Sequence, residues 1–288
     1  MKIYILKKKL LQSSLLIVLL AFIGYAGFSF AMEQLEHYDW SLEDVSKSVE
    51  STDPNKKYGW GVLKPKNEEP PFVPPWLQGL LKEYGAIYMG DSRRKSVALT
   101  FDMGFELEGA TPRILDVMAK HNVKGTFFLC GHWVKTQPDL LKRLISEGHT
   151  VGNHTWNHPS LPDISKDKLT KEIMVLNKDI EQASGCNYKA KYLRPPKGEF
   201  SRTSLDATKN LGFQSVFWSI ATNDWSPMAT SKKVKDDILN QLHPGAIILL
   251  HGNSKAVVDS FDDIIASIKA KGYTIVSLDE IQASDGNV

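Results

Sequence analysis

Two segments of the chain carry side chains that suit hydrolytic chemistry at a metal ion. Residues 100–104 (Thr-Phe-Asp-Met-Gly) end an apolar run on one carboxylate, Asp102, and residues 154–158 (His-Thr-Trp-Asn-His) carry two imidazoles four positions apart. In metal-assisted hydrolysis, imidazoles hold the ion and another group moves a proton. We therefore predict that His154 and His158 ligate a divalent metal, with zinc the expected ion, and that Asp102 is a general base.

Met103 follows Asp102 directly, at the position best placed to supply a third protein ligand. Its thioether is soft and neutral, which makes it a poor partner for zinc or any harder divalent ion. With only two protein ligands, the ion is expected to bind loosely.

Three more polar residues follow other apolar runs. His251 comes after two leucines and before a glycine, and its ordinary pKa near neutrality makes it the natural general acid. The guanidinium fork of Arg194 matches a carboxylate and could hold Asp102 in orientation. Asp224 is the acid best placed to orient His251.

Two residues beside these groups are expected to contact the substrate. Trp225 follows Asp224, and Pro195 follows Arg194. A flat apolar ring next to polar groups suits stacking against a sugar face, although core packing explains most tryptophans equally well.

The elements that must position these residues alternate along the chain beyond Ser96. Short runs rich in β-formers predict strands at residues 97–101, 125–129, 149–152, 192–194, 214–219, 246–250 and 273–276. Apolar residues at helical spacing predict helices at residues 111–121, 138–147, 166–184, 201–211, 231–241 and 259–271.

This alternation predicts an α/β fold with a parallel sheet, either open and doubly wound or closed as a barrel. The polar residues stand at the carboxyl ends of several different strands, which converge on one face only in a (β/α) barrel. We therefore predict a distorted, incomplete (β/α) barrel of about seven strands, with an irregular N-terminal extension.

The front of the chain differs from the rest. Lysines precede an uncharged apolar run over residues 15–31, which predicts an export signal that is either cleaved or kept as a membrane anchor. We assign residues 1–31 to this segment, 32–91 to a proline-rich extension or linker, and 92–283 to the catalytic domain. The protein is then extracytoplasmic, secreted or membrane-anchored, and contacts the membrane only through its N-terminal segment.

The composition sets further bounds. The 288 residues have a formal net charge of +2 and no long basic block, which gives no case for nucleic-acid binding. We expect a monomer. Cys130 and Cys186 belong to the part expected outside the cytoplasmic membrane, where a disulfide can form, but we favour two free thiols over a bridge.

Together these residues resemble the polysaccharide deacetylase family, carbohydrate esterase family 4. Its five motifs appear in order at residues 100–104, 154–158, 194–196, 224–225 and 249–251, and the resemblance spans roughly residues 92–283. It implies a distorted (β/α) barrel and metal-dependent removal of acetyl groups from N-acetylated sugars.

By position, the resemblance implies that Asp102 is the general base, that Arg194 steadies it and that His251 is the general acid. It implies that His154 and His158 are two of the metal ligands. Two positions depart from the family's pattern. Most members have an aspartate ligand where Met103 stands, and many have an aspartate where Ala221 stands.

Met103 also indicates which branch of this family the chain resembles. Enzymes that deacetylate muramic acid on the way to the δ-lactam of spore-cortex peptidoglycan resemble this chain in replacing that aspartate. They also have an aromatic residue and a glutamate after the glycine, here Phe105 and Glu106. The implied partners are peptidoglycan glycan strands of the cell wall, and the implied process is sporulation.

Two other functions stay open. A cell-wall glycan-binding protein of the same fold that has lost its chemistry is favoured by Met103, whereas the intact Asp102 and His251 argue against it. A glycoside hydrolase is weaker, because it needs two carboxylates across a scissile bond and only Asp102 and Asp224 are available.

Overall fold

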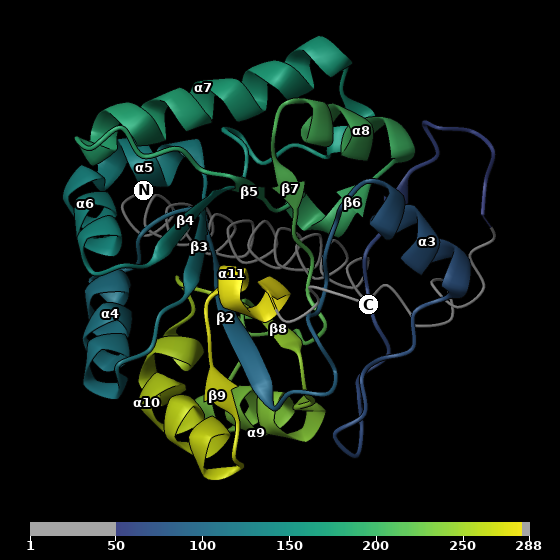
Figure 1. Ribbon diagram of the computed structural model, residues 1–288. Coiled ribbons are helices and arrows are strands. Elements are labelled where there is room, and N and C mark those ends of the chain that lie inside the picture. The colour runs from purple at the N-terminus through teal and green to yellow at the C-terminus, as the bar shows by residue number, and fades with distance from the viewer. Residues whose placement is uncertain (1–49, 284–288) are drawn as a thin grey trace, which may run out of the picture. The chain divides into compact units, whose positions relative to one another are not determined.

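A parallel sheet centred on β2 (Ser96–Met103) organises residues 50–283, the part of the chain that the computed structural model describes (Figure 1). The strands follow the order β7, β5, β4, β3, β2, β8, and β9 pairs with the start of β2. These other strands are β3 (Thr126–Leu129), β4 (Thr150–Asn153), β5 (Tyr192–Leu193), β7 (Gln214–Ser215), β8 (Ala246–His251) and β9 (Thr274–Ile275).

The sheet curls toward closure without completing it. The chain beyond β7 returns to β8 through a single parallel bridge between Ile220 and Ile248, and Ile87 forms another with Val216. Isolated bridges replace a continuous ladder at this side. The prediction of a distorted, incomplete (β/α) barrel of about seven strands is therefore confirmed.

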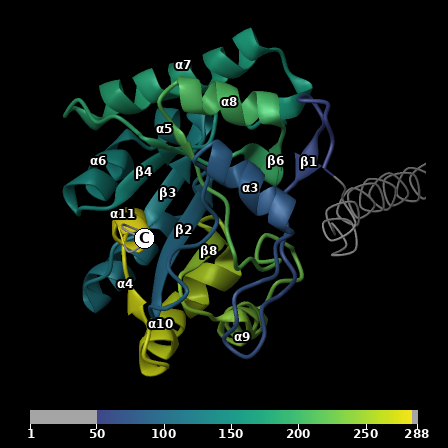
Figure 2. The ribbon, with the colours of Figure 1, turned by 45° about the vertical axis from the view of Figure 1, so that its right-hand side comes forward.

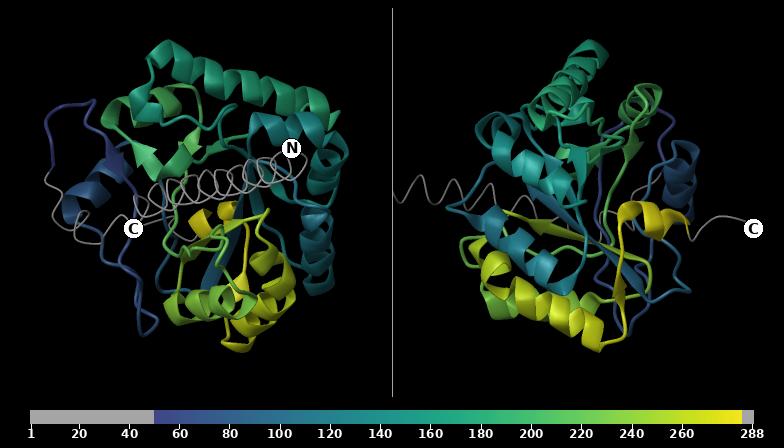
Figure 3. Two further views of the ribbon diagram at one scale, coloured as in Figure 1. Left: turned by 180° about the vertical axis from the view of Figure 1, so that it is seen from behind. Right: turned by 60° about the vertical axis from the view of Figure 1, so that its left-hand side comes forward.

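Helices surround the curled sheet on its outer side (Figures 2 and 3). They are α4 (Ala110–His121), α5 (Gly131–Thr136), α6 (Pro138–Ser146), α7 (Lys166–Ser184), α8 (Arg202–Asn210), α9 (Ser231–Gln241) and α10 (Lys255–Ala270). The last helix, α11 (Leu278–Ala283), instead packs on the inner face of the sheet, where Leu278 and Ile281 join Ala98, Phe128 and Ile247. Short 3₁₀ turns lie at Leu161–Asp163 and Pro196–Gly198.

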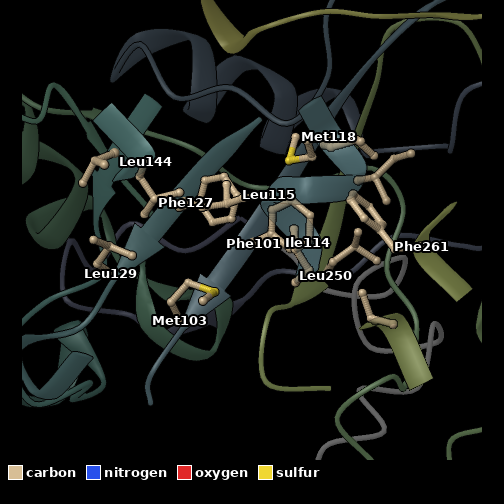
Figure 4. Packing of buried hydrophobic residues seen from close by; sticks show 14 of the residues in the cluster. Phe101, Met103, Ile114, Leu115, Met118, Phe127, Leu129, Leu144, Leu250 and Phe261 are labelled. Atoms are coloured by element: carbon tan, nitrogen blue, oxygen red, sulfur yellow. The ribbon is translucent and has the colours of Figure 1, made fainter. Parts of the chain in front are cut away.

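The two faces of β2 have different environments, because successive side chains of a strand point to opposite sides. Leu99, Phe101 and Met103 join the apolar layer between sheet and helices, with Ile114 of α4 and Phe261 of α10 (Figure 4). The alternate residues, Thr100 and Asp102, face the inner side of the sheet, where they meet Arg194. The strand thus buries one face and presents polar groups on the other.

The segment before β2 packs against the body of the fold. β1 (Tyr58–Gly59) pairs antiparallel with β6 (Glu199–Phe200), and α3 (Pro75–Glu83) packs its leucines on a second apolar cluster. Trp60 is the main contact: its backbone N–H donates to the Gly198 carbonyl at 2.8 Å and its indole N–H to the Trp218 carbonyl at 2.8 Å. This arm therefore supports the loop that follows β5.

The predicted leader at residues 1–31, and the beginning of the predicted extension, lie outside the described residues. Within residues 50–283, no helix combines the length and apolar character needed to cross a bilayer. Both cysteines are free thiols, Cys130 buried and Cys186 exposed.

Candidate active site

Asp102 and Arg194 form a buried ion pair at the carboxyl end of β2. Arg194 Nη1 donates to Asp102 Oδ1 at 2.9 Å, and the guanidinium is fully buried. Burial raises the pKa of the Asp102 carboxyl, but the positive groups around it, with the hydrogen-bonded Arg194 guanidinium permanently charged among them, outweigh burial and hold it below its ordinary value. The carboxylate is therefore ionised at neutral pH.

Arg194 is fixed by its remaining donors. Nη2 donates to Thr100 Oγ1 at 2.8 Å and to the Phe217 carbonyl at 3.2 Å, while Nε donates to the Val216 carbonyl at 3.2 Å. The Phe128 ring lies 4.3 Å from the guanidinium carbon. A planar donor held on so many sides orients the carboxylate that it binds.

His154 follows β4 and lies beside the same carboxylate. Its Nδ1 is 2.8 Å from the Arg194 carbonyl oxygen, and since a carbonyl can only accept, Nδ1 carries the proton. The lone pair is then on Nε2, 3.4 Å from Asp102 Oδ2. Burial lowers the pKa of His154, which keeps the ring neutral.

His158 completes a pair of imidazoles. Its ring centre lies 4.8 Å from that of His154, with the planes at 72°. Burial lowers the pKa of His158 to about 3, so this ring is neutral as well. The loop adopts left-handed backbone at Thr155 (φ 64°) and His158 (φ 57°), which costs of order 1–3 kcal/mol at each non-glycine residue and persists only where the surroundings enforce it.

His251 and Asp224 form a second pair, next to the first. Asp224 Oδ1 lies 2.8 Å from His251 Nδ1, and Oδ2 accepts the His251 backbone N–H at 2.7 Å. Burial lowers the pKa of His251, but the Asp224 carboxylate outweighs it, so the pKa is raised above its ordinary value. About a quarter of the His251 side chain (26%) remains exposed, which leaves Nε2 as the nitrogen for proton transfer.

The sheet itself brings the two pairs together. Asp102 of β2 is the register partner of His251 in β8, so the two residues are direct neighbours on adjacent strands. Ser254 Oγ donates to the Asp224 carbonyl at 2.6 Å and steadies the loop on which that acid lies. The structure thus gathers the six predicted polar residues at one end of the half-barrel.

The donor groups fit a divalent ion held by two imidazoles. Both rings are neutral, and the proton on His154 Nδ1 leaves Nε2 available as a ligand atom. No group of three His, Cys, Asp or Glu residues that could hold a metal ion occurs among the described residues.

Met103 adds no ligand atom, because it lies in the apolar layer. The side chain is fully buried, and its sulfur lies against the backbone of Gly252: a Cβ at that glycine would be 2.1 Å from Sδ. Figure 4 shows it among the buried hydrophobic side chains at the end of β2.

The two predicted substrate-contacting residues have different environments. Trp225 is 38% exposed and lines a groove of about 490 Å³ together with Asp224 and Phe105, itself 50% exposed. Pro195 is buried in the turn after Arg194, where its carbonyl accepts from the Gly198 N–H at 3.1 Å. The exposed aromatic surface beside the two pairs is therefore that of Trp225 and Phe105.

Sequence reasoning gave no role to Thr100 or Glu172, and it named Glu106 as a mark of the branch without finding its contacts. Glu106 accepts from the Thr111 N–H at 2.9 Å and from the Trp133 indole at 3.3 Å, which ties it to the first turn of α4. Glu172 bonds the loop that carries the two histidines. Its position three residues after Leu169, on the buried side of α7, was the signal that could have revealed it.

Comparison with known proteins places this site in a family. The polysaccharide deacetylase family matches residues 89–216. The peptidoglycan-N-acetylmuramic acid deacetylase PdaA of Bacillus subtilis is 42% identical over 230 residues, covering 79% of this chain and 87% of the relative. Its structure, described as a family 4 carbohydrate esterase, aligns with a TM-score of 0.76 over 79% of this chain and 97% of that chain.

Two further relatives are informative. A peptidoglycan-N-acetylglucosamine deacetylase of Bacillus cereus is 36% identical over 202 residues, 69% of this chain and 72% of the relative. A structure from Bacillus anthracis described as a family 4 pseudoenzyme is 30% identical, with a TM-score of 0.64 over 68% of each chain.

A half-barrel whose strand ends join a carboxylate, an arginine and three histidines defines a hydrolytic enzyme. The chain belongs to the polysaccharide deacetylase family, carbohydrate esterase family 4, and this confirms the resemblance predicted from its five motifs.

Proposed function

We propose that this protein removes N-acetyl groups from peptidoglycan amino sugars, and that its substrate is N-acetylmuramic acid on the route to the muramic δ-lactam of spore cortex. The observation that carries the proposal is the pairing, on neighbouring strands, of a carboxylate whose pKa is lowered with an imidazole whose pKa is raised. The 42% identity to a peptidoglycan-N-acetylmuramic acid deacetylase over 79% of the chain supports the choice of sugar. The products are acetate and a free amine.

His154 and His158 would hold a divalent ion, with zinc the ion we favour. Such an ion supplies Lewis acidity to the acetamide carbonyl and lowers the pKa of a bound water. The neutral rings and the free Nε2 of His154 are the features of this chain that suit it.

Asp102 would act as the general base. Its carboxylate is ionised and buried, and Arg194 holds one of its oxygens at 2.9 Å. The other oxygen, Oδ2, would take the proton from the attacking water as the water adds to the carbonyl carbon. Arg194 would keep the carboxylate oriented through this step.

His251 would act as the general acid. Asp224 fixes Nδ1 and raises the pKa of the ring, which favours the form in which Nε2 also carries a proton. Transfer of that proton to the departing nitrogen would let the C–N bond break and release the sugar as an amine.

Trp225 would border the bound sugar, whereas Pro195, buried in the turn after Arg194, would contribute by shaping that turn. The exposed indole of Trp225 suits stacking on a sugar face, and its groove passes directly beside Asp224. We further propose that the enzyme works outside the cytoplasm on glycan strands, as a monomer that meets the membrane only through its N-terminal segment.

A second candidate is a catalytically impaired protein that binds cell-wall glycan. It is favoured by Met103, which adds no ligand, and by the likeness to a family 4 pseudoenzyme. Glycoside hydrolysis is disfavoured, because both Asp224 oxygens already bind His251 and cannot serve a glycosidic bond.

One experiment separates these candidates. The full chain is incubated with peptidoglycan freed of stem peptides, with added zinc or with a chelator, and released acetate is measured. We expect acetate with zinc, loss on chelation and recovery when zinc is restored. Mass spectrometry of the digested glycan should place the free amine on muramic acid. Glycan binding with no acetate under any metal would establish the impaired protein instead.

A further inference from the structure

Glu172 of α7 is a buried carboxylate that the proposed chemistry does not use. It is 6% exposed, and both of its oxygens accept from one residue: Oε2 from the Asn157 backbone N–H at 2.7 Å and Oε1 from the Asn157 side-chain amide at 2.8 Å. The ion pairs of residues 50–283 do not include it. A carboxylate is costly to bury when its hydrogen-bond donors are amides and no cation pairs with it, so the neighbouring residues should explain why it is there.

Those surroundings are the loop that carries the two imidazoles. Asn157 directly precedes His158, and the Trp156 N–H donates to the Glu172 backbone carbonyl at 3.2 Å. At the other end of the loop, the Asn153 side chain donates to the Ile173 carbonyl at 2.9 Å. Two consecutive residues of α7 therefore hold the loop at both ends.

The loop also needs this support, because its backbone is strained. Thr155 and His158 both have left-handed φ angles, although neither is glycine. Internal bonds join them: Asn153 Oδ1 accepts from the Thr155 N–H at 2.9 Å, and Thr155 Oγ1 accepts from the His158 N–H at 3.1 Å. Among the described residues, Glu172 accepts the hydrogen bonds of both the backbone and the side chain of Asn157, which directly precedes His158.

We propose that Glu172 is a positioning residue for the metal pair, which fixes His158 through Asn157 and adds a buried carboxylate behind the loop that carries both imidazoles. The inference rests on the proposed ligand roles of His154 and His158. Groups behind the ligands orient them and add favourable charge, and their loss typically weakens metal binding by about 10- to 100-fold.

The test compares zinc affinity by titration calorimetry across four forms of the full chain. Glu172→Gln removes the charge and turns an amide N–H toward the donors of Asn157. The double variant Glu172→Gln/Asn157→Asp restores one negative charge and complementary hydrogen bonding with the partners exchanged. Asp91→Asn is the matched control, since Asp91 is a carboxylate of similar burial (8% exposed) bound by Arg93, before the opposite end of β2.

We expect Glu172→Gln to bind zinc about 10- to 100-fold more weakly than the wild type, the exchanged pair to recover to within about threefold, and Asp91→Asn to match the wild type. Equal affinity of Glu172→Gln and the wild type would overturn the inference. So would a loss that the exchanged pair does not recover, or an equal loss in Asp91→Asn.

Two other outcomes remain decisive. If Glu172→Gln does not fold, the exchanged pair decides alone: near wild-type zinc affinity supports the inference, and a folded protein with weak binding overturns it. If the wild type binds no zinc, both the proposed ligand roles and this inference fail. If the wild type binds zinc and Glu172→Gln binds it equally well, the ligand roles stand and only this inference fails.

Discussion

At the scale of single residues, two carboxylates acquire opposite roles from their partners. Asp102 binds a guanidinium, which is permanently charged, so the carboxylate stays ionised and ready to accept a proton. Asp224 binds an imidazole and raises its pKa, so the carboxylate favours the protonated form of that ring. The proposed division into a base at Asp102 and an acid at His251 follows from what each aspartate touches.

The first prediction concerns pH. Because the Asp224 carboxylate raises the pKa of His251, replacing it in Asp224→Asn lowers that pKa. The acid form of His251 is present below its pKa, so activity should begin to fall at lower pH in the variant than in the wild type. The alkaline limb of kcat/KM against pH measures this, and a limb that does not move would contradict the role of Asp224.

His251 itself should account for the proton delivered to the amine. His251→Ala should lower kcat by about 10²- to 10⁴-fold, the usual contribution of a general acid. Zinc affinity should be unchanged, because the ring is not one of the proposed ligands. A kcat within about threefold of the wild type would exclude His251 as the acid.

Arg194 should matter to stability as well as to chemistry. Arg194→Met leaves Asp102 buried without its permanent cation, and breaking a buried pair in this way usually costs about 3–5 kcal/mol. Chemical denaturation would measure the loss in free energy of unfolding. The double variant Arg194→Met/Asp102→Asn should recover part of the lost free energy of unfolding. If Arg194→Met is as stable as the wild type, Arg194 is not needed to compensate the buried Asp102 carboxylate.

At the scale of elements, the loop after β4 is held between α7 and the turn that begins α5. The Gly131 N–H donates to the Trp156 carbonyl at 3.1 Å, and a Cβ at Gly131 would lie 2.1 Å from the Trp156 ring. The glycine is required here by close approach, because the indole fills the space that a side chain would need. The two elements thus fix the histidine loop from opposite sides.

Gly131→Ala tests this contact. The added methyl group must displace the Trp156 ring, so we expect a loss of about 1–3 kcal/mol in the free energy of unfolding, together with weaker zinc binding. Gly104→Ala is the control, since a Cβ there meets nothing within 4 Å and should change stability by less than about 0.5 kcal/mol. Equal stability of the two variants would contradict the close packing.

The sequence predicted the long elements well. The helices at residues 166–184 and 231–241 were predicted with the bounds observed, because their N-caps, Ser165 and Thr230, and their periodicity agree. α10 begins at Lys255, four residues before the predicted start, because Ser254 caps it. α3 was missed within the proline-rich segment, although Pro75 at its first turn is a helix-start signal.

The candidate site was predictable where residues stand at strand ends. Asp102, His154 and His251 follow apolar runs, so a barrel brings them together by topology alone. Glu172 and Thr100 could not be found in this way, because their roles depend on which loop crosses a helix and on which side chain Arg194 reaches. Such contacts depend on tertiary packing rather than on periodicity.

At the scale of the whole molecule, the arm before β2 and the half-barrel share apolar contacts. Trp60 lies 5.0 Å from the Phe217 ring and 5.1 Å from Tyr88, and it bonds two carbonyls of the body. The second apolar cluster includes residues of both parts. We therefore expect the arm and the barrel to unfold together.

Trp60→Ala should reveal this coupling. Truncation of a buried tryptophan costs about 3–5 kcal/mol, and the loss should appear in the single transition of the whole body. Circular dichroism and tryptophan fluorescence should give coincident curves for the wild type and for the variant. A separate early transition would mean that the arm folds independently.

The pairing of β2 with β8 has a consequence for how this protein can change over evolutionary time. Because Asp102 and His251 are partners in adjacent strands, backbone hydrogen bonds set their spacing at about 4.8 Å. Insertions in the surrounding loops can reshape the groove beside Phe105 and Trp225 without altering that spacing. Descendants of this chain should therefore acquire new sugars more readily than new bonds to cleave.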